Sequence, residues 1–168
     1  MPCAETCSEG GPVLAVPAEL ASGWGGVANG DYERACQADD HTSLDYGAVG
    51  TVTVGTGWAL ALDLELMTAF LQTSSGGVII RNYEDDPLEE DAAQAMVAGV
   101  DTWTAWGRPL RLSDGRLFLF DSACPGAADP DEIEAEEGVI AADLGPGEYA
   151  LHIAVSDGLE FIRLTKLS

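Results

Sequence analysis

Two histidines are the residues of this chain best suited to acid–base chemistry or to metal binding. His41 follows Asp39 and Asp40, and such a trio can hold a metal ion or form part of an acid–base site, but no second group of ligands stands at a helpful spacing. His152 is expected on a strand, opposite Arg163, on the face away from the neighbouring aliphatic residues. We therefore interpret His152 as a surface strand residue, and neither histidine as catalytic.

The cysteines and glycines show no catalytic pattern either. Cys3 and Cys7 lack the second tight pair of a structural zinc site, so reduced thiols without a metal are the better interpretation. Residues 23–30 lack the lysine of a phosphate-binding loop, and the sequence has no Gly-x-Ser-x-Gly elbow. Carboxylates are so numerous that choosing two as a glycosidase pair is arbitrary. We expect a protein that is not an enzyme and that needs no cofactor.

The acidity of the chain indicates what it can bind. With 29 Asp and Glu against 7 Lys and Arg, the formal net charge is −22 over 168 residues. Such a surface repels nucleic acid and attracts cationic partners, whose approach it accelerates at low salt. Because 46% of the residues are apolar, the chain can still bury a core. An acidic folded protein with a cationic protein partner is the resulting expectation.

Two clusters concentrate the acids: residues 84–91 hold six in eight positions, and residues 129–137 hold six in nine. The first cluster is partly explained by the start of a predicted helix, whose dipole favours anions. The second has no such explanation and is our candidate partner-binding segment: Asp129, Asp131, Glu132, Glu134, Glu136 and Glu137. A salt-adapted organism or a high-GC genome would produce similar acidity without any partner, and this alternative stays open.

Apolar patterning predicts several hairpins. Residues 51–54 and 58–64 alternate around Gly55-Thr56-Gly57, with Trp58, Leu60, Leu62 and Leu64 on one face. Two further hairpins are predicted at Asp114-Gly115 and Asp157-Gly158, dipeptides that suit two-residue turns. Their expected cross-strand pairs are as follows: Leu110 with Leu119, Leu112 with Leu117, Leu151 with Leu164, and Ile153 with Ile162.

One main amphipathic helix is predicted near 87–102, with Asp86 as its N-cap and Pro87 at its first position. A helical turn is expected at 18–24, and a short helix begins at Asp31, which we expect to cap it. The predicted fold class is α+β, mainly antiparallel β, as a sheet or sandwich of hairpins. Residues 1–11 are predicted as a flexible leader and 12–168 as a single domain. No apolar run reaches a membrane span, and the N-terminus lacks signal-peptide features, so we expect a cytoplasmic location.

These segments resemble a known family. Gly10-Gly11-Pro12 before an aliphatic strand, then Trp24, then Asp31-Tyr32-Glu33-Arg34-Ala35-Cys36, is similar to the immunity protein 21 family of bacterial polymorphic toxin systems. A strand at 116–121 and Pro146-Gly147-Glu148-Tyr149 before the last hairpin continue the likeness, which spans roughly residues 10–167. The residues that match the family pattern are Gly10, Gly11, Trp24, Asp31, Tyr32 and Arg34. Each of them either supports the fold or contacts a partner, and an internal ion pair is the natural role of Arg34.

The resemblance implies a cytoplasmic, non-catalytic protein that neutralises a cognate protein toxin. A basic nuclease-like domain is one candidate toxin, because an acidic inhibitor can occupy a basic substrate cleft. The resemblance implies neither nucleic acid nor membrane as a partner, and it leaves the oligomeric state open. Two alternatives remain from the residues alone: an acidic DNA mimic of the anti-restriction type, and a carboxylate-dependent hydrolase.

Overall fold

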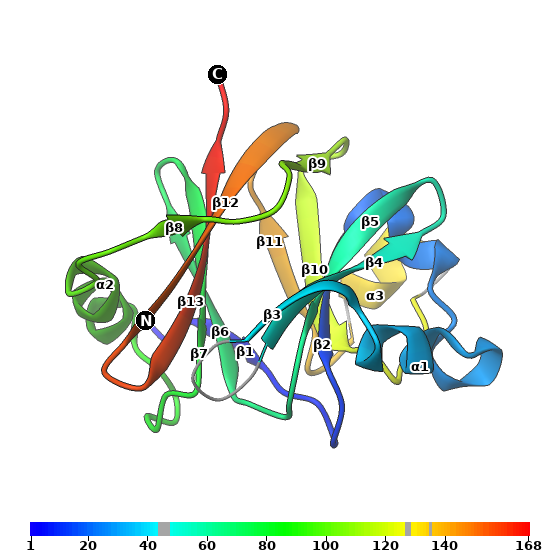
Figure 1. The fold of residues 1–168 in the computed structure, drawn as a ribbon, viewed down its shortest axis with the longest axis horizontal. Coiled ribbons are helices and arrows are strands. Elements are labelled where there is room, and N and C mark those ends of the chain that lie inside the picture. Colours follow the sequence, from blue (N-terminus) through cyan, green and yellow to red (C-terminus); the bar gives the residue numbers. More distant parts are fainter. Residues whose placement is uncertain (44–47, 127–128, 135) are drawn as a thin grey trace.

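Two antiparallel sheets packed face to face form the framework of the chain (Figure 1). The structure, a computed structural model, describes residues 1–43, 48–126, 129–134 and 136–168, and within 39–48 it describes no side chain. The strand order of the first sheet is β1 (Ala4–Thr6), β6 (Thr68–Thr73), β7 (Gly76–Arg81), β13 (Leu159–Lys166), β12 (Gly147–Ser156) and β8 (Thr104–Ala105), with β9 (Leu110–Leu112) also paired to β12. The order of the second sheet is β11 (Ile140–Asp143), β10 (Arg116–Asp121), β2 (Val13–Pro17), β5 (Gly57–Leu62), β4 (Ala48–Val54) and β3 (Asp39–Ser43). The predicted fold class, α+β and mainly antiparallel β, is confirmed.

Short helices cover the outer face of each sheet. They are η1 (Ala18–Gly23), η2 (Gly26–Asn29), α1 (Asp31–Cys36), α2 (Glu90–Ala98) and α3 (Pro130–Glu134). Figure 1 shows α2 on the outer side of the first sheet and α1 and α3 on the outer side of the second. The resulting layers are helix, sheet, sheet and helices, so both sheets are covered on both faces.

Three apolar layers follow from this stacking. The central layer between the sheets includes Val13, Leu60, Leu119 and Ile162. A second layer lies under η1, α1 and α3, and a third lies under α2. In β2 every residue is buried, because alternate side chains enter the central layer and the layer under the helices. This explains why β2 reads as a continuous apolar run instead of an alternating one.

The hairpin of β12 and β13 has the predicted register, with Leu151 opposite Leu164 and Ile153 opposite Ile162. Asp157 and Gly158 both have positive φ, at 50° and 76°, as a two-residue hairpin turn requires. The hairpin of β4 and β5 is also confirmed, with Trp58, Leu60 and Leu62 packed on the central layer. Leu64 is different from the prediction, because it lies beyond β5 and is exposed.

The hairpin predicted at Asp114-Gly115 is wrong. β9 pairs with β12, through Leu110 opposite Tyr149, and β10 pairs with β2 and β11. Both edges of β10 are therefore occupied, and the chain crosses from one sheet to the other at this turn. Leu110 and Leu119 still share the central layer, but they reach it from opposite sheets.

The main helix begins at Glu90, later than predicted, and ends at Ala98. Neither Asp86 nor Pro87 has its predicted role: the N-cap is Glu89, without a side-chain hydrogen bond. The reason is that the backbone before the helix is occupied by the N-terminus. Leu88 O accepts a hydrogen bond from Cys3 N (2.8 Å), and Glu90 N donates one to Met1 O (3.0 Å).

The same contacts bear on the segment predicted as a flexible leader. Within residues 1–11, β1 pairs with β6 in the register Ala4 opposite Phe70, and Cys3 is buried. This part of the segment is therefore integrated into the first sheet. The division into a leader and a single domain from residue 12 stays a prediction.

Candidate functional site

The residues of the family pattern lie close together, in two groups around α1. In the first group, Asp31 Oδ1 accepts hydrogen bonds from Arg34 Nη2 (2.8 Å) and Nε (3.1 Å), which confirms the expected internal ion pair. Arg34 Cζ also lies 5.6 Å from the centre of the Trp24 ring, and Nη1 donates to Thr53 O (2.9 Å). Arg34 thus connects α1, the segment after η1 and strand β4.

Asp31 does not cap α1 as predicted. The N-cap is Gly30, and the other oxygen of Asp31 instead accepts a hydrogen bond from Gly25 N (2.8 Å). Burial acts to raise the pKa of Asp31, but the hydrogen bonds from Gly25 and Arg34 outweigh burial and hold this pKa below its ordinary value. Asp31 is therefore a buried, ionised connector between two turns.

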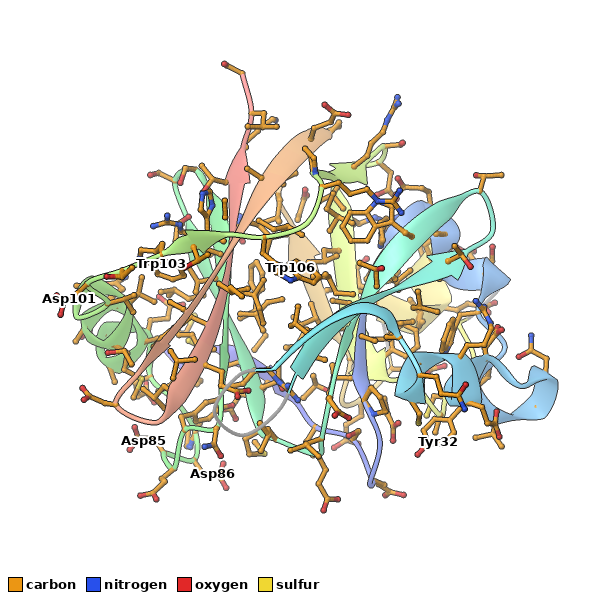
Figure 2. The ribbon with its side chains drawn as sticks, viewed as in Figure 1. Tyr32, Asp85, Asp86, Asp101, Trp103 and Trp106 are labelled. Atoms are coloured by element: carbon orange, nitrogen blue, oxygen red, sulfur yellow. The ribbon has the colours of Figure 1, made fainter. Side chains whose placement is uncertain are left out.

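The second group joins Gly11 to Tyr32, which is labelled in Figure 2. A Cβ atom on Gly11 would lie 2.4 Å from Tyr32 Cε2, so only glycine leaves room for this ring. Gly10 precedes it at φ 119°, a conformation that glycine adopts readily, and the Ser8 hydroxyl donates to Gly11 O. These contacts give each of the six pattern residues a structural role.

The acidic segment 129–137 is partly helical, because it contains α3. Asp129 Oδ1 accepts a hydrogen bond from Asp131 N (2.9 Å) at the start of α3, and the side chain of Ile133, within α3, is buried. Arg116 Nη1 lies 3.0 Å from both Asp131 Oδ1 and Glu134 Oε2. Hydrogen bonds to Asp131 and Asp114 raise the pKa of Arg116, so its positive charge is firmly held beside the helix. Two acids of the segment are thus partly neutralised.

Four of the six acids make no ion pair among the described residues: Asp129, Glu132, Glu136 and Glu137. All four are exposed. The candidate segment therefore presents charge mainly at its two ends.

A groove of about 270 Å³ lies where the acidic segment meets the N-terminal segment of the family pattern. We call it the acidic groove; its acids are Glu9, Asp121, Glu136 and Glu137. Phe120, Ile133 and Val139 contribute its apolar lining, and Cys7 and Cys124 contribute thiols. Asp121 is fixed by hydrogen bonds from Glu9 N (3.1 Å) and Ala123 N (2.9 Å).

Three of the four acids of the groove act electrostatically on the Cys124 thiol, which lines the same groove. Burial raises the pKa of this thiol, and the carboxylates of Asp121, Glu136 and Glu9 raise it further. Three segments distant in sequence therefore place negative charge around one point. Sequence reasoning found Glu136 and Glu137 but missed Glu9 and Asp121, because no spacing in the chain relates them.

The loop beside the groove is held by the family pattern. Trp24 Nε1 donates to Ser122 O (2.9 Å), and Gly126 N donates to Trp24 O (2.8 Å). Trp24 is almost fully buried, with 1% of its surface exposed. It acts as a buried support for residues 122–126, whose Cys124 and Pro125 line the groove.

The acids of the first cluster lie elsewhere. Figure 2 shows Asp85 and Asp86 on the side of the molecule opposite Tyr32. Glu89 pairs with the N-terminal amino group (3.2 Å). The two acidic clusters are therefore separate surfaces.

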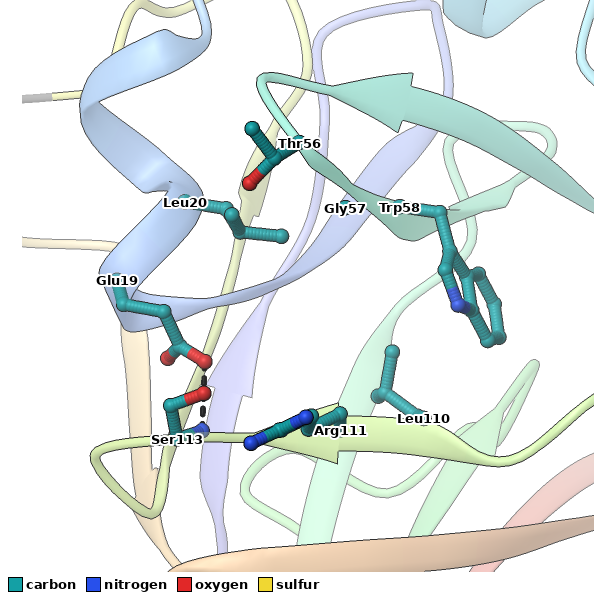
Figure 3. A pocket seen from close by; sticks show the side chains of 8 residues that line it. All are labelled: Glu19, Leu20, Thr56, Gly57, Trp58, Leu110, Arg111 and Ser113. Atoms are coloured by element: carbon teal, nitrogen blue, oxygen red, sulfur yellow. Dashed lines mark hydrogen bonds between the residues drawn. The ribbon is translucent and has the colours of Figure 1, made fainter.

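A second pocket, of about 280 Å³, lies between η1, the β4–β5 turn and β9 (Figure 3). We call it the arginine pocket; it is lined by Glu19, Leu20, Thr56, Gly57, Trp58, Leu110, Arg111 and Ser113. Arg108 Cζ lies 4.9 Å from the centre of the Trp58 ring. Sequence reasoning assigned Trp58 to the core and missed this pocket, although two arginines three residues apart stand out in so acidic a chain.

The other candidates of the sequence analysis are the histidines with their neighbours and the cysteines. His152 lies opposite Arg163, as predicted. The side chains of His41, Asp39 and Asp40 lie outside the described residues. In the part of the chain that the structure describes, no three His, Cys, Asp or Glu side chains are grouped to hold a metal, and the four cysteines are free thiols.

Comparison with known proteins gives one match. The family model described as immunity protein 21 matches residues 6–159. No curated protein and no solved structure matches the chain. Among the described residues, no helix is both long and apolar enough to cross a membrane. The match covers nearly the whole chain and agrees with the pattern residues around α1: the chain belongs to the immunity protein 21 family.

Proposed function

We propose that this protein binds and neutralises a cognate bacterial toxin without catalysis, through the acidic groove and the exposed acids of residues 129–137. Family membership supports a toxin-neutralising function, since the family consists of immunity proteins. A cytoplasmic location fits this proposal, because a toxin that enters or arises in the cell is neutralised there.

The observation that carries the proposal is the convergence of Glu9, Asp121 and Glu136 on Cys124. An apolar lining with an acidic rim suits a lysine or arginine side chain, whose stem is apolar and whose head is charged. The pattern residue Trp24 supports one wall of the same groove. The proposed site thus joins the family pattern and the acidic segment in one surface.

The proposed partner is a basic protein surface, such as the substrate cleft of a nuclease-like toxin. Long-range attraction by exposed acids increases the association rate, and buried contacts then slow dissociation. The net charge of −22 is large enough for such steering at low salt.

Kinetic binding to the cognate toxin, at two salt concentrations, tests the proposal. The test variant neutralises four exposed acids at the groove and its segment: Glu9→Gln, Glu132→Gln, Glu136→Gln and Glu137→Gln. Asp131 and Glu134 stay unchanged because they hold Arg116, and Asp129 stays because it begins α3. We expect association to slow roughly tenfold at low salt, with a flatter salt dependence and a smaller change in dissociation.

The matched control removes the same charge from another surface: Glu65→Gln, Glu84→Gln, Asp85→Asn and Asp91→Asn, all exposed. If steering depends on the groove, the control slows association much less than the test variant. Equal effects of the two variants would assign the attraction to net charge alone. A test variant with the wild-type rate and salt slope would place the binding face elsewhere.

A further inference from the structure

The arginine pocket presents a positive charge on a strongly acidic protein. Figure 3 shows Thr56, Gly57 and Trp58 on one side of the pocket and Leu110, Arg111 and Ser113 on the other. Arg111 is exposed, and it makes no ion pair within the described residues. Its partner across the strand pair is Glu148, without an ion pair between them.

Most other cations of the chain have internal roles. Arg34 pairs with Asp31, Arg81 with Glu160, and Arg116 with three acids. Arg163 is partly buried, with its guanidinium 4.2 Å from the centre of the Trp103 ring. By contrast, Arg111 and Arg108 are both exposed; Arg111 lines the pocket together with the partly buried Trp58, and Arg108 lies against the Trp58 ring. Tryptophan and arginine are enriched among the residues that dominate protein interfaces.

The one acid of the pocket is turned away from an incoming group. Glu19 Oε1 accepts a hydrogen bond from Ser113 N (2.6 Å), and Oε2 is buried without a hydrogen-bond partner among the described residues. The charge that the pocket presents to solvent is therefore that of Arg111, while Leu20, Trp58 and Leu110 provide apolar walls.

We propose that the arginine pocket receives an aspartate or glutamate side chain of the toxin, with its carboxylate on the Arg111 guanidinium. The inference rests on the proposed function and adds a second contact of opposite sign to it. Guanidinium binds carboxylate through two parallel hydrogen bonds, which fix direction as well as distance. The apolar walls enclose the stem of the acidic side chain.

This contact gives the complex its orientation. An acidic surface alone attracts a basic toxin in many orientations, because long-range attraction is not directional. An acidic side chain on the toxin is repelled by most of this acidic surface, and the arginine pocket offers it a positive charge with apolar walls around it. Complementary charges of both signs therefore specify one register of the complex.

Binding kinetics of single-charge variants test the inference, again with the cognate toxin. Arg111→Gln removes the charge and keeps a long polar side chain on an exposed position. Lys166→Gln removes the same charge from an exposed residue that does not line the pocket. We expect Arg111→Gln to weaken affinity at least tenfold, mainly through faster dissociation, and Lys166→Gln to change it less than twofold.

A reciprocal experiment identifies the toxin residue. Each exposed Asp or Glu of the toxin is changed to Lys and measured against Arg111→Glu. One toxin variant should restore affinity to Arg111→Glu while weakening binding to the wild type. Glu19→Gln tests whether the pocket instead receives a basic toxin side chain that is directed at Glu19. Such an occupant predicts weaker binding of the Glu19→Gln variant, and that result would overturn the inference.

The outcomes separate this inference from the proposed function. If Arg111→Gln binds like Lys166→Gln while the groove variant associates slowly, the function stands and the pocket contact is wrong. If the wild type does not bind the toxin, both proposals are wrong. Unchanged melting temperatures of the variants exclude loss of folding as the cause.

Discussion

Replacing Arg81 by methionine tests how the two sheets are connected. Arg81 and Glu160 are both 0% exposed, and their charged atoms lie 3.9 Å apart. Arg81 also donates to Thr68 Oγ1 (3.1 Å) and to the carbonyl oxygens of Asp63 (2.8 Å) and Leu64 (2.9 Å). Residues 63–67 connect β5 of one sheet to β6 of the other, so Arg81 holds this crossing in place.

The expected cost follows from the buried charges. Burial lowers the pKa of Arg81 to about 10, against the opposing effects of Glu160 and Asp63, so the guanidinium is protonated at neutral pH. Arg81→Met removes the positive charge that lies 3.9 Å from the buried Glu160 carboxylate, a loss of about 3–5 kcal/mol. The cost of the lost hydrogen bonds does not simply add to the cost of the buried carboxylate, so we expect a total loss of stability of about 4 kcal/mol. For a chain of this size, that corresponds to a fall in Tm of roughly 8–16 °C.

Urea and thermal unfolding of four variants measure the effect. The double variant Arg81→Met, Glu160→Met should be more stable than Arg81→Met alone, because it no longer buries a carboxylate from which the Arg81 charge has been removed. Glu160→Gln should cost less than Arg81→Met, because Arg81 keeps its oxygen partners on residues 63–68. The exposed control Arg111→Met should stay within about 0.5 kcal/mol of the wild type. A cost below about 1 kcal/mol for Arg81→Met, or a double variant no more stable than Arg81→Met alone, would refute the reasoning.

Two predictions concern the family pattern. Gly11→Ala forces the Tyr32 ring to move, so we expect the free energy of unfolding to fall by about 1–2 kcal/mol, measured by thermal unfolding. The control Gly99→Ala should be near neutral, because a Cβ atom there makes ordinary 3.5 Å contacts. A Gly11→Ala protein as stable as Gly99→Ala would contradict the close contact. Asp31→Asn removes the ion pair with Arg34 and should cost about 2 kcal/mol at pH 7. The folded pKa of Asp31 is lowered, so its contribution to stability is present above about pH 4 and is lost as the pH falls through the folded pKa. When Tm is plotted against pH, the curves of Asp31→Asn and wild type should therefore converge in acid. Parallel curves would contradict this.

Two turns with the same sequence signature show where local prediction works and where it stops. At Asp157-Gly158 both residues adopt positive φ, and the flanking strands pair as their apolar residues predict. At Asp114-Gly115 only the glycine is positive, at φ 89°, and the chain leaves the sheet. The difference is set by β2, β11 and β12, which occupy the edges that a local hairpin would need. That competition involves segments far apart in sequence.

The same limit applies to the candidate site. The Arg34 ion pair was predictable because Asp31 lies three residues away on one short helix. The acidic groove was not, because Glu9, Asp121 and Glu136 meet only after β1, β10 and α3 are assembled. The predicted start of the main helix was wrong for a related reason, since the backbones of Leu88 and Glu90 are hydrogen-bonded to the N-terminal residues and not to a local cap.

The distribution of charge, more than its total, connects this fold to binding. Asp31, Asp131 and Glu134 all count toward the net charge of −22, yet each pairs with an arginine that holds a structural element. Acids used in this way are already compensated and attract a partner weakly. The exposed, unpaired acids at the groove act over the longest range, and Arg111 lies apart from them in a different pocket. The complex that we propose therefore needs a partner surface that is basic opposite the groove and locally acidic opposite the arginine pocket; in this proposal a uniformly basic protein is attracted without being held in one register.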